Sequence, residues 1–211
     1  RPSSRPWVRE PAGVSRPYDH ADDAHLREET VSRETVFQGR LLQVRRDRIR
    51  LPDGGDATRE FIVHPGAVMV VPILDDGRLV MERQWRYPLE RVMLEFPAGK
   101  LEAGEPTLQC AQRELLEETG YRASEWALAG VLHNAIAYSS ERIEIWFARG
   151  LAAGERRLDE GEFLDLQLVE EAELDRLCAT GAVTDAKTLI GLQWLQNWRA
   201  GRWAIPGFTL R

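Results

Sequence analysis

Three glutamates, Glu114, Glu117 and Glu118, occupy one short stretch of the chain at a spacing that suits a metal ion. If residues 106–119 form one helix, Glu114 and Glu118 are one turn apart and Glu117 lies beside them at i+3. Carboxylates on one stripe repel each other, and a divalent cation reverses the sign of that interaction. Mg²⁺ prefers oxygen ligands and usually sits between a few carboxylates and substrate phosphates. The stripe therefore predicts a cation site for a phosphorylated substrate.

The helix that carries this stripe has clear start and stop signals. Proline is tolerated at the first helical position, where we place Pro106, and Gly120 stands where a glycine commonly ends a helix. Leu108, Ala111 and Leu115 form an apolar face opposite the acidic one. The pattern predicts an amphipathic helix with its carboxylates on the polar face.

The surrounding sequence alternates between strand-like runs and one more helix. Strands typically show either an apolar residue at every second position or a continuous apolar run. Turns rich in Gly, Pro and Asp separate such segments in this chain. The order lacks a regular βαβ rhythm, so an α+β fold fits better than a doubly wound sheet. We expect strands near residues 42–51, 58–63, 68–73, 78–84, 141–148 and 164–169, and a helix over 185–199.

Composition excludes several classes of protein. A net charge of −6 argues against a nucleic-acid binder, which normally shows a basic face. The longest apolar stretch is too short to span a bilayer, and no secretion signal is visible, so we expect no membrane partner. Cys110 and Cys178 do not belong to a CxxC motif or to another spacing typical of metal ligands. We therefore interpret them as reduced thiols in a cytoplasmic protein.

The stretch 99–121 resembles the Nudix box and matches it at every charged and glycine position that the box defines. Residues 64–68, 84–88, 95–99 and 185–188 are similar to the ADP-ribose pyrophosphatase branch of the Nudix hydrolases, and the likeness extends over most of residues 35–198. The matching box positions are Gly99, Glu105, Arg113, Glu114, Glu117, Glu118 and Gly120.

The resemblance implies an α+β fold, a Nudix α/β/α sandwich with a mixed sheet, preceded by N-terminal antiparallel strands. We expect residues 1–33 to be an arm that is either flexible or docked on a partner subunit. Residues 34–65 would form a β-strand subdomain for dimerisation, and residues 66–211 the Nudix hydrolase domain. The branch forms homodimers with exchanged N-terminal strands, which we expect here by analogy.

The resemblance also assigns roles to the box. Glu114 and Glu118 are expected to be direct Mg²⁺ ligands, helped by the backbone carbonyl of Ala98, with Mn²⁺ as a substitute ion. Glu117 is expected to ligate a metal or to orient water bound to it, and Arg113 to pair with Glu117. Three further positions are structural: Glu105 hydrogen-bonds into the box, and Gly99 and Gly120 allow backbone conformations that a Cβ would hinder.

An acidic loop at residues 158–163 supplies candidates for the general base. In the resembled branch this loop carries a mobile glutamate base and another metal ligand. We assign Glu160 as the base and Glu162 as the ligand, and an ordinary solvated loop is the alternative. Water attack on a pyrophosphate needs neutralised charge, an oriented water and a base.

Substrate contacts are assigned to four residues. Arg86 suits a pyrophosphate or a terminal ribose, because guanidinium pairs bidentately with such oxygens. Glu141 aligns with a glutamate that the branch places near substrate and metals. Arg50 and Arg59 either clamp a base across a dimer or are surface cations.

One departure from the branch concerns the substrate. ADP-ribose pyrophosphatases usually carry a proline shortly after the box, whereas residues 107–205 contain none. The implied reaction is Mg²⁺-dependent hydrolysis of a nucleoside diphosphate sugar, led by ADP-ribose giving AMP and ribose 5-phosphate. The alternatives are a broader hydrolase of substrates such as GDP-mannose or ADP-glucose, and a non-catalytic module that senses nucleotides.

Overall fold

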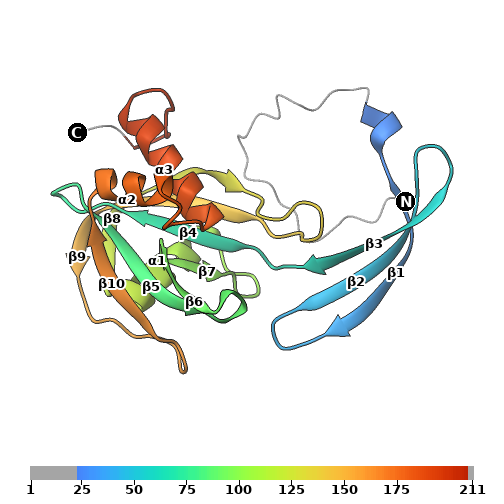
Figure 1. Cartoon of the computed structure of the whole chain (residues 1–211), viewed down its shortest axis with the longest axis horizontal. Helices are drawn as coiled ribbons and strands as arrows, with labels where there is room; N and C mark the ends of the chain where they lie inside the picture. Colours follow the sequence, from blue (N-terminus) through green and yellow to red (C-terminus); the bar gives the residue numbers. More distant parts are fainter. Residues whose placement is uncertain (1–22, 209–211) are drawn as a thin grey trace. The chain divides into compact units, whose positions relative to one another are not determined.

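The computed structural model describes residues 23–208, which form two compact units (Figure 1). The first unit comprises the described residues up to 65 together with residues 135–140. The second comprises residues 66–134 and 141–208 of the described chain. Each unit has its own strands, and no helix within residues 23–208 has both the length and the apolar character needed to cross a membrane.

The first unit is a three-stranded antiparallel sheet in the order β1-β2-β3. A short 3₁₀ helix (Asp23–Leu26) precedes β1 (Glu29–Gln38), which is followed by β2 (Gln43–Arg50) and β3 (Asp56–Val63). β1 begins at Glu29, inside the range 1–33 that we expect to be an N-terminal arm, and residues 1–22 of that arm lie outside the described residues.

The strands of the second unit form two sheets. One is mixed, in the order β7-β4-β9-β8, with β4 and β9 parallel and the other pairs antiparallel. The other is antiparallel, in the order β10-β5-β6. The strands are β4 (Ala67–Pro72), β5 (Leu79–Arg86), β6 (Arg91–Glu95), β7 (Ala98–Lys100), β8 (Tyr121–Leu132), β9 (Ile143–Ala153) and β10 (Leu164–Val169).

Helices cover both faces of the mixed sheet. On one face, α1 (Thr107–Thr119) buries Ala111 and Leu115 against Val68 and Val70 of β4. On the other, α2 (Glu171–Ala179) and α3 (Ala186–Arg199) belong to a larger apolar core. This second core includes Met69, Val71, Phe147, Leu174, Leu192 and Leu195. The expected α/β/α sandwich is confirmed, and burial on both faces explains the continuous apolar run of β4.

The ends of α1 differ slightly from the expected ones. Pro106 is the N-cap with an extended backbone (ψ 141°), so the helix begins at Thr107 and not at the proline. Gly120 ends the helix with φ 74°, and its N–H donates to the Leu116 carbonyl at 2.8 Å. A Cβ is strained at this φ, so the requirement for glycine here is conformational.

Candidate active site

Helix α1 carries the acidic stripe on the side that borders β7. Glu114 and Glu118 are one turn apart, and the Glu118 side chain is buried with 5% of its surface exposed. Its Oε2 accepts a hydrogen bond from the backbone N–H of Ala98 at 3.1 Å. The helix and β7 therefore bring Glu118 next to the backbone of Ala98, and the role of the Ala98 carbonyl as a metal ligand stays a prediction.

Gly99 provides room for Glu114 rather than an unusual backbone conformation. Its φ is not positive, so the conformational reason that we expected is wrong. A Cβ on Gly99 would instead lie 1.8 Å from Cδ and Oε1 of Glu114. The glycine is required because the carboxyl group packs directly against the strand.

Arg113 is the centre of an ion-pair network on the box helix. Its guanidinium donates to both oxygens of Glu105 at 2.8 and 2.9 Å, to Glu114 Oε1 at 2.8 Å and to Glu117 Oε2 at 3.1 Å. The expected pairing with Glu117 is present. Glu105 also accepts from the Glu102 N–H at 3.0 Å, and these hydrogen bonds, the one from Arg113 first, lower its pKa to about 2. Arg113 thus fixes three carboxylates at once.

A buried glutamate that the sequence analysis missed lies next to the stripe. Glu82 in β5 is 3% exposed and close enough to Glu118 for the two carboxyl groups to share a hydrogen bond. Its Oε1 has no hydrogen-bond partner within residues 23–208. The signal that could have revealed it is a carboxylate placed directly after the apolar run Leu79-Val80-Met81.

The loop before β10 contributes one more carboxylate. Glu162 is half-buried and accepts a hydrogen bond from Gln84 of β5 at 3.4 Å, and its charge acts on Glu82, Glu114 and Glu118. Glu160, two residues earlier, is exposed on the loop. The structure therefore brings Glu162 toward the stripe, and the assignment of Glu160 as base stays a prediction.

The carboxyl groups of this cluster hold their protons unusually well. Burial raises the pKa of Glu114 to about 6, with Arg113 opposing the shift. Burial and then repulsion from Glu162 raise the pKa of Glu82, and burial and then repulsion from Glu82 raise the pKa of Glu118. The cluster is short of positive charge, which a bound cation would supply.

A second network holds the arginine expected to contact substrate. Arg86 donates to both oxygens of Glu95 at 2.6 and 2.9 Å, and Lys187 pairs with Glu95 and, at 3.0 Å, with Asp185. The Arg86 side chain remains 41% exposed. Lys187 and Glu95 were not anticipated as partners, because 92 residues separate them in the chain.

The other expected substrate contacts are dispersed. Glu141 accepts a hydrogen bond from Asn134 at 3.5 Å within the second unit. Arg50 and Arg59 belong to the first unit, where Arg50 pairs with Asp56 at 3.2 Å and Arg59 pairs with Glu28. Within the second unit, the structure joins the box residues and Glu162 into one cluster, and the roles of Arg50 and Arg59 stay predictions.

The donor set of the cluster fits a hard divalent cation. All the side-chain donors are carboxylate oxygens, the type that Mg²⁺ prefers, and one buried oxygen of Glu82 lacks a partner. Within residues 23–208, no group of three His, Cys, Asp or Glu side chains already converges as a metal site. The carboxylates are instead engaged by Arg113 and by the Ala98 N–H.

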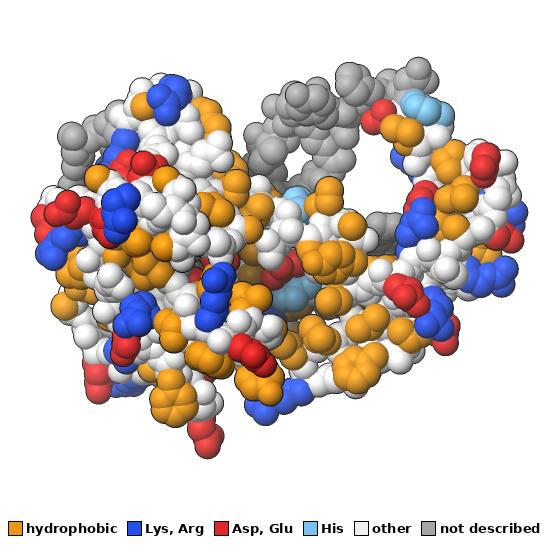
Figure 2. All heavy atoms as spheres, in the orientation of Figure 1, with side chains coloured by type: hydrophobic (Ala, Val, Ile, Leu, Met, Phe, Trp, Pro, Cys, Tyr) orange, Lys and Arg blue, Asp and Glu red, His pale blue; other side chains and the backbone are white. Residues whose placement is uncertain are grey.

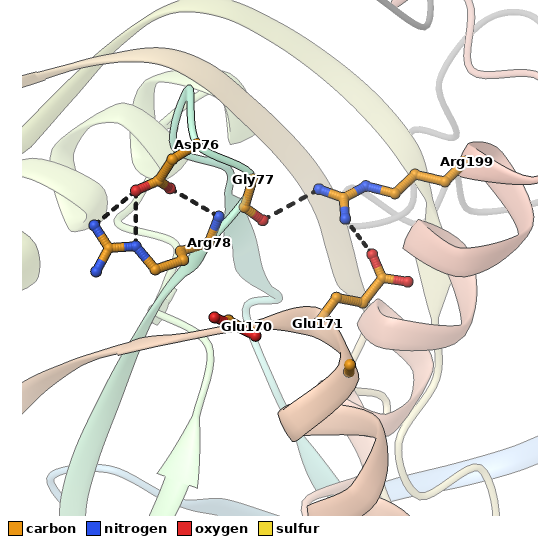
Figure 3. A pocket seen from close by; sticks show the side chains of 7 residues that line it. Asp76, Gly77, Arg78, Glu170, Glu171 and Arg199 are labelled. Atoms are coloured by element: carbon orange, nitrogen blue, oxygen red, sulfur yellow. Dashed lines mark hydrogen bonds and ion pairs between the residues drawn. The ribbon is translucent and has the colours of Figure 1, made fainter.

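A separate hollow of about 430 Å³ lies between the β4–β5 turn, α2 and α3 (Figure 3). Both arginines that line it are already paired, Arg78 with Asp76 at 2.7 Å and Arg199 with Glu171. It shares no residue with the carboxylate cluster, which is therefore the candidate active site. The lining residues are Asp76, Gly77, Arg78, Glu170, Glu171, Ala172 and Arg199.

Comparison with known families and proteins agrees with this geometry. The family model for the NUDIX domain matches residues 63–191, and that for the nucleoside diphosphate sugar hydrolase N-terminal domain matches residues 28–62. The chain is a Nudix hydrolase. In this Nudix hydrolase the two family matches meet at residue 62/63, close to the boundary between the two units at residue 65.

Individual relatives of the Nudix hydrolase cover most of its length. It is 38% identical to the ADP-ribose pyrophosphatase of Bacillus subtilis (strain 168), over 81% of this chain and 94% of that protein. It is 39% identical to the methanol dehydrogenase activator of Bacillus methanolicus, over 80% and 92% of the two chains. Its fold matches the crystal structure of an ADP compounds hydrolase with a TM-score of 0.74 and 27% identity, covering 83% of this chain and 95% of that one.

Proposed function

We propose that this Nudix hydrolase is a Mg²⁺-dependent pyrophosphatase that splits ADP-ribose into AMP and ribose 5-phosphate. The observation that carries the proposal is the oxygen-only carboxylate cluster on the box helix, in which Glu118 and Glu82 are buried and one Glu82 oxygen has no hydrogen-bond partner within residues 23–208. The match to a nucleoside diphosphate sugar hydrolase N-terminal domain and the similarity to an ADP-ribose pyrophosphatase support the substrate class.

The cation would be held by the box. Glu114 and Glu118 are the proposed direct ligands, and the backbone carbonyl of Ala98 would assist them. Glu117, at the exposed side of the stripe, would ligate a metal or orient water bound to it. Mg²⁺ bound there would neutralise the pyrophosphate charge and lower the pKa of an attacking water, and Mn²⁺ would serve as a substitute. Arg113 holds the carboxylate of Glu117 at 3.1 Å and so limits the orientations available to it.

Proton removal is assigned to the acidic loop. Glu160 is the proposed general base, since its exposed position leaves its carboxylate accessible to an incoming substrate and water. Glu162, held by Gln84, is the proposed additional metal ligand.

Substrate recognition is proposed to involve the network around Arg86. The half-exposed guanidinium has donors left after its two hydrogen bonds to Glu95, and these suit the pyrophosphate or the terminal ribose. Glu141 is the proposed contact near the metals, and Arg50 and Arg59 the proposed contacts to the base.

We further propose that the enzyme is a cytoplasmic homodimer with exchanged N-terminal strands, in which residues 34–65 form the dimerisation subdomain and 66–211 the catalytic domain. β1 is exposed along its entire length, and hydrophobic side chains interspersed with charged ones are visible over these strands in Figure 2. The exposed hydrophobic residues are Val31, Val36, Phe37, Leu41 and Leu42. Light scattering should give the mass of a dimer, and a monomer would contradict strand exchange.

The substrate itself is tested by comparing kcat/KM for ADP-ribose, ADP-glucose, GDP-mannose, a diadenosine polyphosphate and a dinucleotide with Mg²⁺. We expect ADP-ribose to be preferred. If a hexose nucleotide is preferred, the protein is a broader nucleoside diphosphate sugar hydrolase and not an ADP-ribose pyrophosphatase. The proline-free loop at residues 132–139 favours that alternative. Binding without turnover of any of these compounds would indicate a sensing module.

A further inference from the structure

Glu82 has a place in the fold that its neighbours in sequence do not explain. Side chains alternate along β5, so that Met81 enters the apolar core while Glu82, Gln84 and Arg86 share the opposite face. This is the face on which Gln84 holds Glu162 and Glu82 meets Glu118. The strand thus directs a carboxylate at the box helix from the sheet.

One carboxyl oxygen of Glu82 lacks a hydrogen-bond partner in the described part of the chain. It is 3% exposed, and its Oε1 has no hydrogen-bond partner within residues 23–208. The neighbouring cation, Arg86, uses two hydrogen bonds to hold Glu95, the residue opposite Glu82 in the β5–β6 pair. A buried carboxyl oxygen without a hydrogen-bond partner is costly, and a valine or isoleucine would suit a buried strand position.

We propose that Glu82 is a further ligand of the divalent cation, supplied from β5 opposite the ligands of helix α1. The inference rests on the metal dependence in the proposed function. The cation would then contact carboxylates from three elements: Glu114 and Glu118 from α1, Glu162 from the loop before β10, and Glu82 from the sheet. A bound cation would provide the partner that the buried Oε1 atom lacks.

Metal affinity, measured without substrate, tests this role. Mn²⁺ is titrated into the full chain and free Mn²⁺ is followed by electron paramagnetic resonance. Glu82→Gln keeps the shape of the side chain and removes its charge, and we expect the Mn²⁺ dissociation constant to rise by about tenfold or more. The matched control is Asp165→Asn, which removes one charge from an exposed position of the neighbouring strand β10. This control should change the dissociation constant less than twofold.

The outcomes separate this inference from the proposed function. If the parent binds Mn²⁺ and Glu82→Gln binds it equally well, Glu82 is not a ligand and only this inference is overturned. If the parent binds no divalent cation, the metal-dependent function fails as well. Should Glu82→Gln not fold, Glu82→Val provides the same comparison. Crystals of the parent soaked in Mn²⁺ decide without any variant: a manganese ion within about 2.5 Å of a Glu82 oxygen supports the role, and one coordinated without Glu82 overturns it.

Discussion

Replacing Gly99 by alanine should displace Glu114, a proposed metal ligand, without removing it. The new Cβ would lie 1.8 Å from Cδ and Oε1 of Glu114 and 2.4 Å from its Cγ. Real Cβ contacts are not shorter than about 3.0 Å, so the carboxyl group must retreat by roughly 1.2 Å. Because the obstacle is the end of a flexible side chain, we expect the fold to survive and Glu114 to leave its position.

The expected effect is large on activity and moderate on stability. A 1 Å misplacement of an active-site group costs about 10²-fold in rate, so kcat/KM should fall by at least about 100-fold, or about 2.7 kcal/mol of transition-state stabilisation. Overpacking of this kind destabilises by about 1–3 kcal/mol. Gly104→Ala is the control, because Gly104 lies in the loop that follows β7, with φ 78° and nothing within 4 Å of an added Cβ. It should lose stability through backbone strain and keep its activity within about threefold.

The assay is hydrolysis of ADP-ribose with saturating Mg²⁺, together with urea unfolding of each variant. A double-mutant cycle with Glu114→Ala completes the test, since in that background the new methyl group has no carboxyl group to meet. Gly99→Ala should then cost much less stability. Activity of Gly99→Ala within threefold of the parent would refute the steric reasoning, as would an unchanged stability cost in the Glu114→Ala background.

Three further predictions follow from the same cluster. Glu118 has a raised pKa in the folded state, caused first by burial and then by repulsion from Glu82, so its contribution to stability is present below the unfolded value near 4.5 and is lost as pH rises. In EDTA, Glu118→Gln should therefore melt above the parent at pH 8, and a lower melting temperature would contradict the raised pKa of Glu118. Glu160→Gln should lower kcat by about 10²–10⁴-fold, and a kcat within about threefold of the parent would exclude Glu160 as the base. Arg113→Lys keeps the charge but loses the branched guanidinium group that holds Glu105, Glu114 and Glu117. The Mn²⁺ affinity of this variant, measured by calorimetry, should therefore fall by about tenfold. An unchanged affinity would contradict the positioning role of Arg113.

The box helix could be predicted from sequence because its signals are local. The i, i+3, i+4 spacing of its glutamates, the apolar face and Gly120 all lie within one segment, and the helix ends at Thr119 as expected. Its start was displaced by one residue, because Pro106 takes the extended backbone of an N-cap. The role of Gly99 was misread, since its close contact with Glu114 depends on how β7 meets α1.

Features without a local signal were missed. Every residue of β1 (Glu29–Gln38) is exposed, so its sequence carries no buried–exposed alternation, and part of it was assigned to the N-terminal arm. The short helix α2 (Glu171–Ala179) buries only Leu174 and offers too little periodicity. Glu82 and the pairing of Lys187 with Glu95 depend on contacts between distant segments, which strand pairing and helix packing create.

The central claim is that the carboxylate cluster hydrolyses the pyrophosphate bond of ADP-ribose with a divalent cation. It is tested most directly by identifying the products formed from ADP-ribose and Mg²⁺ in ¹⁸O-labelled water by mass spectrometry. We predict AMP and ribose 5-phosphate in equal amounts, with one ¹⁸O per turnover, no reaction in EDTA, and losses of at least about 10²-fold in Glu114→Gln and Glu118→Gln. Cleavage that persists in EDTA or in both variants would contradict the account, as would intact ADP-ribose with the parent enzyme.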